Sequence, residues 1–167
     1  MKKSTSLIFW FPLLLIFISC TDCKETELQQ DEISRIENLL ERYVVASENK
    51  DYQTIENIWA ANDSIMLFGT DSHEKLMGWQ SIRDAFRKQF TLIDNTYISV
   101  SDRYIKINCT GNTAWFAQIL NYNFMYQDIA HSFEGLRFTG VVEKQDDGNW
   151  KMVQGHLSMP ANIDLGR

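Results

Sequence analysis

The sequence is poor in positive charge, and this deficit excludes two classes of partner. Its 16 Lys and Arg residues stand against 22 Asp and Glu residues, which gives a formal net charge of −6. Nucleic acids and anionic membrane surfaces are bound through basic patches. We therefore expect no nucleic-acid partner and no electrostatic binding of the folded part to a membrane surface.

Cysteine and histidine are also scarce, with three residues of each. None of their spacings matches a metal-binding pattern. Asp71, His73 and Glu74 lie close together in the sequence but lack regular ligand spacing and a fourth partner. The sequence therefore predicts no metal site and no cofactor.

The one long apolar run, residues 7–18, is too short to cross a bilayer, which needs about 20 residues. It follows the positive start at Lys2 and Lys3, and its length fits the core of a secretory signal peptide. We therefore expect residues 1–19 to be a signal peptide. Removing it would make the remaining chain still more acidic.

The apolar run ends in Phe17-Ile18-Ser19-Cys20, which resembles the lipobox of bacterial lipoproteins, whose cysteine is lipidated. Phe17 stands where leucine is usual, so an ordinary signal peptide cut nearby stays an alternative. The resemblance implies an exported protein whose membrane contact is the lipid on Cys20. Thr21, rather than aspartate, favours the outer membrane, on its periplasmic or surface face. Residues 20–30 are polar and predict a tether.

Residues 31–162 predict one domain, followed by a short tail of residues 163–167. Helical spacing of apolar residues predicts helices over residues 31–49, 52–59 and 80–90, with a short strand over 65–68. From residue 98 the period changes to two, which predicts strands over 98–107, 113–127, 132–144 and 150–158. This order predicts an α+β fold: three N-terminal helices packed on a curved, mainly antiparallel sheet.

The order of elements and several segments resemble a known superfamily. The segments are Phe68-Gly69-Thr70-Asp71, Gly78-Trp79, Ala114-Trp115-Phe116, Arg137-Phe138-Thr139-Gly140-Val141, Asp147-Gly148-Asn149-Trp150 and Gly155-His156-Leu157-Ser158-Met159-Pro160. Together they resemble the SnoaL-like branch (DUF4440 type) of the nuclear transport factor 2-like (NTF2-like) superfamily. The resemblance implies a cone-shaped fold with a pocket between helices and sheet. It does not fix a reaction, since this superfamily holds isomerases, dehydratases, hydrolases, cyclases and non-catalytic binders.

Tyr43 is the first candidate for a catalytic role. Leu40-Glu41-Arg42-Tyr43-Val44 resembles the ketosteroid isomerase helix that supplies a tyrosine hydrogen-bond donor. The same resemblance puts Phe68 where the isomerase has its catalytic carboxylate. A phenyl ring accepts no proton, which argues against chemistry of that kind. The alternative for Tyr43 is a tyrosine packed at the helix–sheet interface.

His156 and Arg137 are the other polar candidates. Strict alternation along the last strand places Trp150, Met152, Gln154, His156 and Ser158 on one face. Histidine at this position recurs in SnoaL-like proteins and could act as an acid, a base or an orienting donor, or merely hold the pocket wall. Arg137 could bind an anionic group of a ligand, or be a solvated surface residue.

Large aromatic residues are numerous for one small domain. We expect five of them to line an apolar pocket with a few polar anchors, although filling the core is their ordinary use; the five are Trp59, Phe68, Trp79, Trp115 and Phe138. Three functions stay open. They are binding of a small, largely apolar molecule without turnover, acid/base catalysis by His156 with Tyr43 or Arg137, and homodimerisation through the outer face of the sheet.

Overall fold

A computed structural model describes residues 27–71 and 73–160, so the predicted signal peptide and Cys20 lie outside the described residues. Within these residues the chain forms three helices and six strands. The helices are α1 (Glu27–Glu48), α2 (Tyr52–Ile58) and α3 (Gly78–Leu92). The strands are β1 (Met66–Phe68), β2 (Lys75–Met77), β3 (Ile93–Ile107), β4 (Thr113–Tyr126), β5 (Ile129–Lys144) and β6 (Trp150–Ser158).

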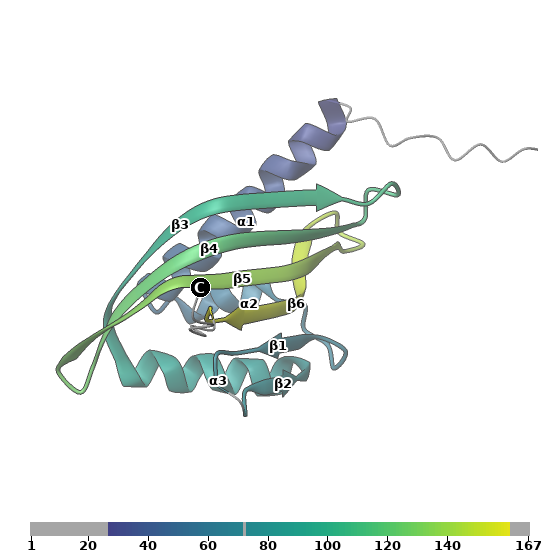
Figure 1. The fold of residues 1–167 in the computed structure, drawn as a ribbon. Coiled ribbons are helices and arrows are strands. Elements are labelled where there is room, and N and C mark those ends of the chain that lie inside the picture. Colours follow the sequence, from purple (N-terminus) through teal and green to yellow (C-terminus); the bar gives the residue numbers. More distant parts are fainter. Residues whose placement is uncertain (1–26, 72, 161–167) are drawn as a thin grey trace, which may run out of the picture.

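The strands form a single sheet in the order β2-β1-β6-β5-β4-β3. Only the β1–β6 pair is parallel among these strands; every other pair is antiparallel. The long strands β3, β4 and β5 curve, and the helices lie against the concave side of the sheet (Figure 1). This architecture confirms the predicted α+β class and the three helices on a curved, mainly antiparallel sheet.

Several elements begin earlier than predicted, such as β3 at Ile93 and β5 at Ile129, and one strand was not predicted. Helix α1 begins at Glu27, inside the segment predicted as a tether. Residues 27–30 (Glu-Leu-Gln-Gln) are good helix formers, so the helix extends beyond the apolar stripe used to predict its start. Strand β2 was not predicted, because three residues with only one partly buried side chain carry too little alternation to be recognised.

A β-bulge in β6 decides which side chains face the helices. Val141 pairs with Gln154 and Val142 pairs with Met152, which leaves Val153 without an opposite residue on β5. The extra residue shifts the alternation by one position. Met152 is fully buried, and a Cβ at Gly155 would contact Trp59 of the core, yet His156 is exposed. The prediction that Met152 and His156 lie on the same face of β6 is therefore wrong.

The core lies between α1, α2, α3 and the concave side of the sheet. Phe138 of β5 contacts Phe116 of β4 with ring centroids 5.0 Å apart. Gly140 lies beside this pair, where a Cβ would approach the Phe116 ring to 2.6 Å. Glycine therefore allows β5 and β6 to pass close to the aromatic core.

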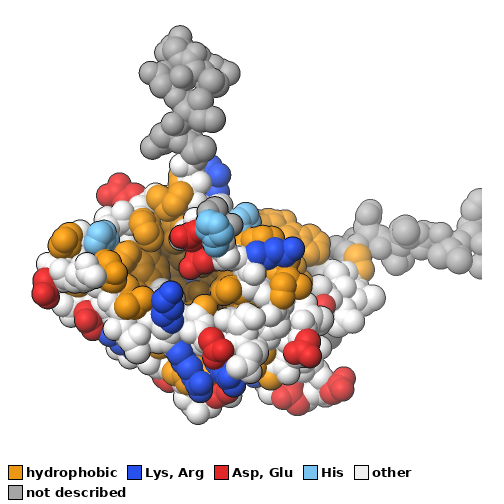
Figure 2. Space-filling view, turned by 90° about the horizontal axis from the view of Figure 1, so that it is seen from below, with side chains coloured by type: hydrophobic (Ala, Val, Ile, Leu, Met, Phe, Trp, Pro, Cys, Tyr) orange, Lys and Arg blue, Asp and Glu red, His pale blue; other side chains and the backbone are white. Residues whose placement is uncertain are grey.

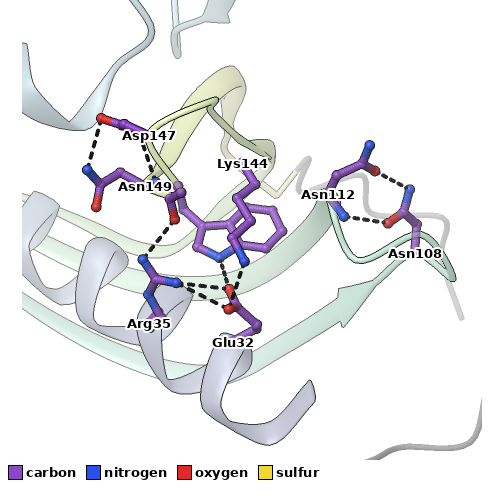
Figure 3. Close-up of polar contacts among 9 residues, drawn as sticks. Glu32, Arg35, Asn108, Asn112, Lys144, Asp147 and Asn149 are labelled. Carbon is purple, nitrogen blue, oxygen red and sulfur yellow. Dashed lines mark hydrogen bonds and ion pairs between the residues drawn. The ribbon is translucent and has the colours of Figure 1, made fainter. Parts of the chain in front are cut away.

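A polar cluster ties the N-terminal half of α1 to the β5–β6 hairpin (Figure 3). The Glu32 carboxylate accepts hydrogen bonds from Lys144 Nζ (2.8 Å), Trp150 Nε1 (2.6 Å) and Arg35 Nη1 (3.1 Å). Burial opposes the charged form of Glu32, but these hydrogen bonds and the two cations outweigh it and lower the pKa of the carboxyl. The ionised carboxylate therefore helps to fasten α1 to the sheet.

The Glu32→Gln variant should lose stability in a pH-dependent way. A carboxyl with a lowered pKa stabilises the fold above its unfolded-state pKa of about 4.3, and this contribution disappears as the pH falls through the folded-state pKa. We expect Glu32→Gln to lower the free energy of unfolding by about 1–2 kcal/mol at pH 7 and by clearly less at pH 3. Urea unfolding at both pH values measures the difference.

Glu37 provides the matched control, because it lies on the same helix and forms no hydrogen bond or ion pair with another described residue. Glu37→Gln should change stability by less than about 0.5 kcal/mol at either pH. An equal loss from Glu32→Gln at pH 7 and pH 3 would contradict the role of its charge.

Candidate functional site

A cavity of about 620 Å³ opens between α1, α3 and the concave side of the sheet. Figure 2 shows a hollowed face with hydrophobic side chains in the hollow and charged side chains of both signs beside it. Most of the wall is apolar, and it comes from two helices (α1 and α3) and all six strands; its apolar members include Leu67, Phe86, Leu120, Phe124, Phe133, Leu136 and Leu157. An apolar wall with few polar groups is the usual form of a small-molecule site.

Two buried residues of α1 bring a hydroxyl to this wall: Ser47, which donates to the Tyr43 carbonyl oxygen (2.8 Å), and Tyr43. The Tyr43 ring lies against Phe138 (centroids 5.0 Å apart) and edge-on to Phe86 (6.0 Å). Its hydroxyl forms no hydrogen bond with another described residue. Burial, with a smaller effect of nearby Tyr122, raises the pKa of Tyr43 well above its usual value. The hydroxyl therefore stays protonated and can donate a hydrogen bond to an occupant of the cavity.

Tyr122 of β4 adds a second hydroxyl to the wall. Gln89 Nε2 of α3 donates a hydrogen bond to Tyr122 Oη at 3.0 Å, and both residues line the cavity. Burial raises the pKa of Tyr122 to about 12, so this hydroxyl is also neutral at ordinary pH. The Gln89–Tyr122 pair fixes the orientation of a second polar group within the apolar wall.

One stripe of α3 forms a rim of the cavity. Its members recur at helical spacing: Ser81, Asp84, Ala85, Lys88, Gln89 and Leu92. Glu74 lies on the rim as well, held by a hydrogen bond from the backbone N–H of Asp71 (3.2 Å). It packs over Gly69 so closely that a Cβ there would lie 2.0 Å from its Oε2. The charged groups therefore gather at the mouth, while the wall carries hydroxyls.

The structure does not bring the three predicted polar anchors together. Tyr43 lines the cavity, whereas Arg137 and His156 are exposed on the opposite face of the sheet. Arg137 pairs with Ser158 across β5 and β6, and its neighbours Leu136 and Phe138 point into the core. Alternation along β5 and the bulge in β6 turn both side chains outward, which corrects the expectation that they line the pocket.

The five predicted aromatic residues also lie outside the wall of the cavity. Trp59 and Phe138 are fully buried in the core, and Trp79 packs against it. Phe68 contacts the His156 ring at 5.8 Å, and Trp115 is 47% exposed. On strand β1 it is Leu67, not Phe68, that lines the cavity.

Sequence reasoning missed most of the actual wall. Gln89 and Lys88 were not singled out, and Glu74 was considered as a possible metal ligand. Tyr122 and Phe124 were expected on the outer face of the sheet, as part of a dimer interface, but they line the cavity. The signal that could have found the α3 residues is the spacing of polar residues beside the apolar stripe of residues 80–90. Within the described residues no three metal-ligating side chains gather, and none of the helices is long and apolar enough to span a membrane.

Solved structures share this fold. A Salmonella enterica serovar Typhimurium protein of the NTF2-like superfamily has a TM-score of 0.73 and 16% identity, covering 83% of this chain and 97% of its own. A candidate scytalone dehydratase from Novosphingobium aromaticivorans has a TM-score of 0.73 and 14% identity, covering 86% and 99%. A candidate calcium/calmodulin-dependent protein kinase II association domain from Xanthomonas campestris has a TM-score of 0.66 and 17% identity, covering 83% and 91%.

At these identities the likeness concerns the fold alone, which is NTF2-like. Residues 36–162 match the model of the SnoaL-like domain family, and the chain belongs to that family. No curated protein sequence matches the chain. The family therefore fixes the architecture, and the chemistry has to be argued from the side chains that line the cavity.

Proposed function

We propose that the domain binds one small, largely apolar molecule in the cavity, without turnover. The observation that supports this most is the Tyr43 hydroxyl, a protonated donor with no partner among the described residues, set in an apolar wall. A volume of about 620 Å³ is in the range of small-molecule sites. The ligand class that fits is a compact apolar body with one carbonyl or hydroxyl oxygen that accepts from Tyr43.

The acid/base alternative lacks a suitable arrangement of groups. General acid/base chemistry needs a titratable group within hydrogen-bond reach of the substrate. His156 and Arg137 lie on the other face of the sheet from Tyr43. Of the carboxylates on the cavity, Asp84 is hydrogen-bonded to Gln80 and Arg83, and Glu74 to the Asp71 backbone. Binding therefore agrees better with the geometry than proton transfer does.

A homodimer formed through the outer face of the sheet is a second proposal. Trp115 (47% exposed) and Tyr104 (55% exposed) lie on this face, near the partly buried Ile119 and Val141. Exposed apolar patches of this kind mark interaction sites. A second copy would cover the two aromatic rings.

The location is also a proposal: an exported lipoprotein held by a lipid on Cys20, in the outer membrane. It rests on the apolar run and lipobox-like end of residues 7–20. The polar residues that follow Cys20 would separate the domain from the lipid surface. A ligand would then meet the domain outside the cytoplasm.

The binding proposal is tested with 2-acetonaphthone, which carries a carbonyl, and with naphthalene, which does not. Both should bind the purified protein. Tyr43→Phe should weaken 2-acetonaphthone binding about fivefold, the worth of one hydrogen bond of about 1 kcal/mol, and leave naphthalene binding unchanged. Ala85→Phe should abolish both, because Ala85 lines the cavity. Fluorescence titration measures the affinities, and native mass spectrometry detects any co-purified ligand.

Val45→Phe is the matched control, since Val45 is 53% exposed and does not line the cavity. It adds the same ring on α1 and should bind as the unaltered protein does. Full binding by Ala85→Phe, or no binding and no co-purified ligand at all, would overturn the proposal.

The lipidation proposal is tested by fractionating bacterial cells that produce the full chain. The membrane should contain the unaltered protein, while Cys20→Ala should release the domain from the membrane, because each buried CH₂ of an acyl chain contributes about 0.8 kcal/mol to anchoring. Cys23→Ala is the matched control and should stay in the membrane. Recovery of Cys20→Ala in the membrane fraction would refute the anchor.

The dimer proposal is tested by light scattering after size-exclusion chromatography. The unaltered domain should have the mass of two chains, and Trp115→Glu should have the mass of one, because a carboxylate would be buried unpaired in the interface. Val45→Glu, on the helical side of the domain, should remain dimeric. A monomeric unaltered domain would exclude this interface.

A further inference from the structure

A second hollow of about 640 Å³ lies between α1, the end of α2 and the β5–β6 turn. It shares no lining residue with the cavity. From α1 it takes residues between Ser34 and Arg42, whereas the cavity takes Tyr43 and Ser47 from another side of the helix. This hollow, the basic groove, is therefore a separate site, and its ligand does not depend on the function proposed for the cavity.

The lining of the basic groove is positively charged, unlike the chain as a whole. Arg35, Arg42 and Lys151 line it with a single carboxylate, Asp147, although the whole chain carries a net charge of −6. Both oxygens of Asp147 accept hydrogen bonds from Asn149, from its backbone N–H (2.9 Å) and from Nδ2 (3.0 Å). Positive charge therefore dominates the lining, and the one carboxylate is hydrogen-bonded within the turn.

Two of the three cations are held in place by the surrounding chain (Figure 3 shows Arg35). Arg35 donates to Gly148 O through Nη2 (2.8 Å) and to Glu32 through Nη1 (3.1 Å). Lys151 Nζ donates to Asn57 O. A guanidinium has five N–H groups and an ammonium three, so both side chains keep donors for a ligand.

Arg42 is the cation of the groove whose guanidinium is not used by the fold. It is exposed, lines the groove, and forms no hydrogen bond or ion pair with another described residue, although its charge acts at longer range on Asp51. A guanidinium binds a phosphate or a carboxylate through two parallel hydrogen bonds. All the N–H donors of Arg42 are therefore free to bind an anion in the groove. Arg35 and Lys151 are held in place beside it and keep further donors.

The neutral polar groups of the groove include two carboxamides, Asn38 and Asn57, besides the Ser34 hydroxyl, which donates to Gln30 O. The side chains of Asn38 and Asn57 form no hydrogen bond with another described residue. A carboxamide both donates and accepts, as a hydroxyl group does. The cations of the groove can bind an anionic group, and the carboxamides beside them can bind hydroxyl groups. A ligand that carries both an anionic group and several hydroxyl groups therefore fits this lining.

We propose that the basic groove binds a small hydroxyl-rich anion of the sugar phosphate or sugar acid class. The anionic group lies against Arg42, with Arg35 and Lys151 beside it. The hydroxyl groups bond to Asn38 and Asn57. Either a phosphate or a carboxylate satisfies the same cations, and titration with one sugar of each kind distinguishes the two.

The test is isothermal titration of the full-length protein or its Cys20→Ala form with four probes: glucose 6-phosphate, glucuronate, glucose and inorganic phosphate. At least one of the two charged sugars should bind, and more tightly than inorganic phosphate, while glucose should not bind. Arg42→Gln should weaken the binding about tenfold through the loss of a charge-assisted hydrogen bond, and Arg42→Lys should recover part of it. Side-chain amide signals of Asn38 and Asn57 should shift in NMR spectra.

Lys88→Gln is the matched control, because Lys88 is an exposed cation on the rim of the other cavity. It should leave the affinity for the charged sugars unchanged. Three results would each overturn the proposal: no saturable binding of either charged sugar, inorganic phosphate binding as tightly as both, or equal binding by Arg42→Gln. Because Ala85→Phe acts only on the cavity, failure of the groove and failure of the cavity are distinguishable.

Discussion

The ring of Tyr43 lies between Phe138 of the sheet and Phe86 of α3, and this packing joins the layers of the domain. Burial of an aromatic ring stabilises a core by area and by edge-to-face contact. The same packing leaves the ring no freedom, so the direction of its hydroxyl is fixed by the core. The Tyr43 side chain therefore belongs to the core through its ring and to the cavity through its hydroxyl.

The concave shape that creates the cavity depends on irregular points in the strands. Register shifts occur in β3 and β6, and between Leu120 and Tyr122 in the pairing of β4 with β5. Gly135, which has a positive φ of 67°, lies at this last shift. Bulges increase local twist and bend the strand. The sheet can therefore curve around the helices instead of packing flat on them, and space remains beneath it.

The helices and most strands could be predicted from the sequence because their periods are long and regular. The inward position of Tyr43 could be predicted for the same reason, since it falls on the apolar stripe of α1. His156 could not be placed, because a bulge of one residue in β6 reverses the faces and leaves no mark in the pattern of apolar residues. Arg137 could have been placed, because alternation along β5 puts it on the face opposite to Leu136 and Phe138. Glu74 and Lys88 were missed for another reason: exposed charged residues at a rim do not differ in sequence from an ordinary solvated surface.

The cavity has a cost that the rest of the fold has to offset. The apolar side chains that face the cavity give up the packing contacts they would make in a filled core. The Tyr43 hydroxyl faces this space and has no hydrogen-bond partner among the described residues. A molecule that fills the apolar space and accepts from Tyr43 supplies both the packing contacts and the hydrogen bond. Binding would therefore raise the stability of the domain, and an apolar molecule lacking an acceptor would recover only the packing part.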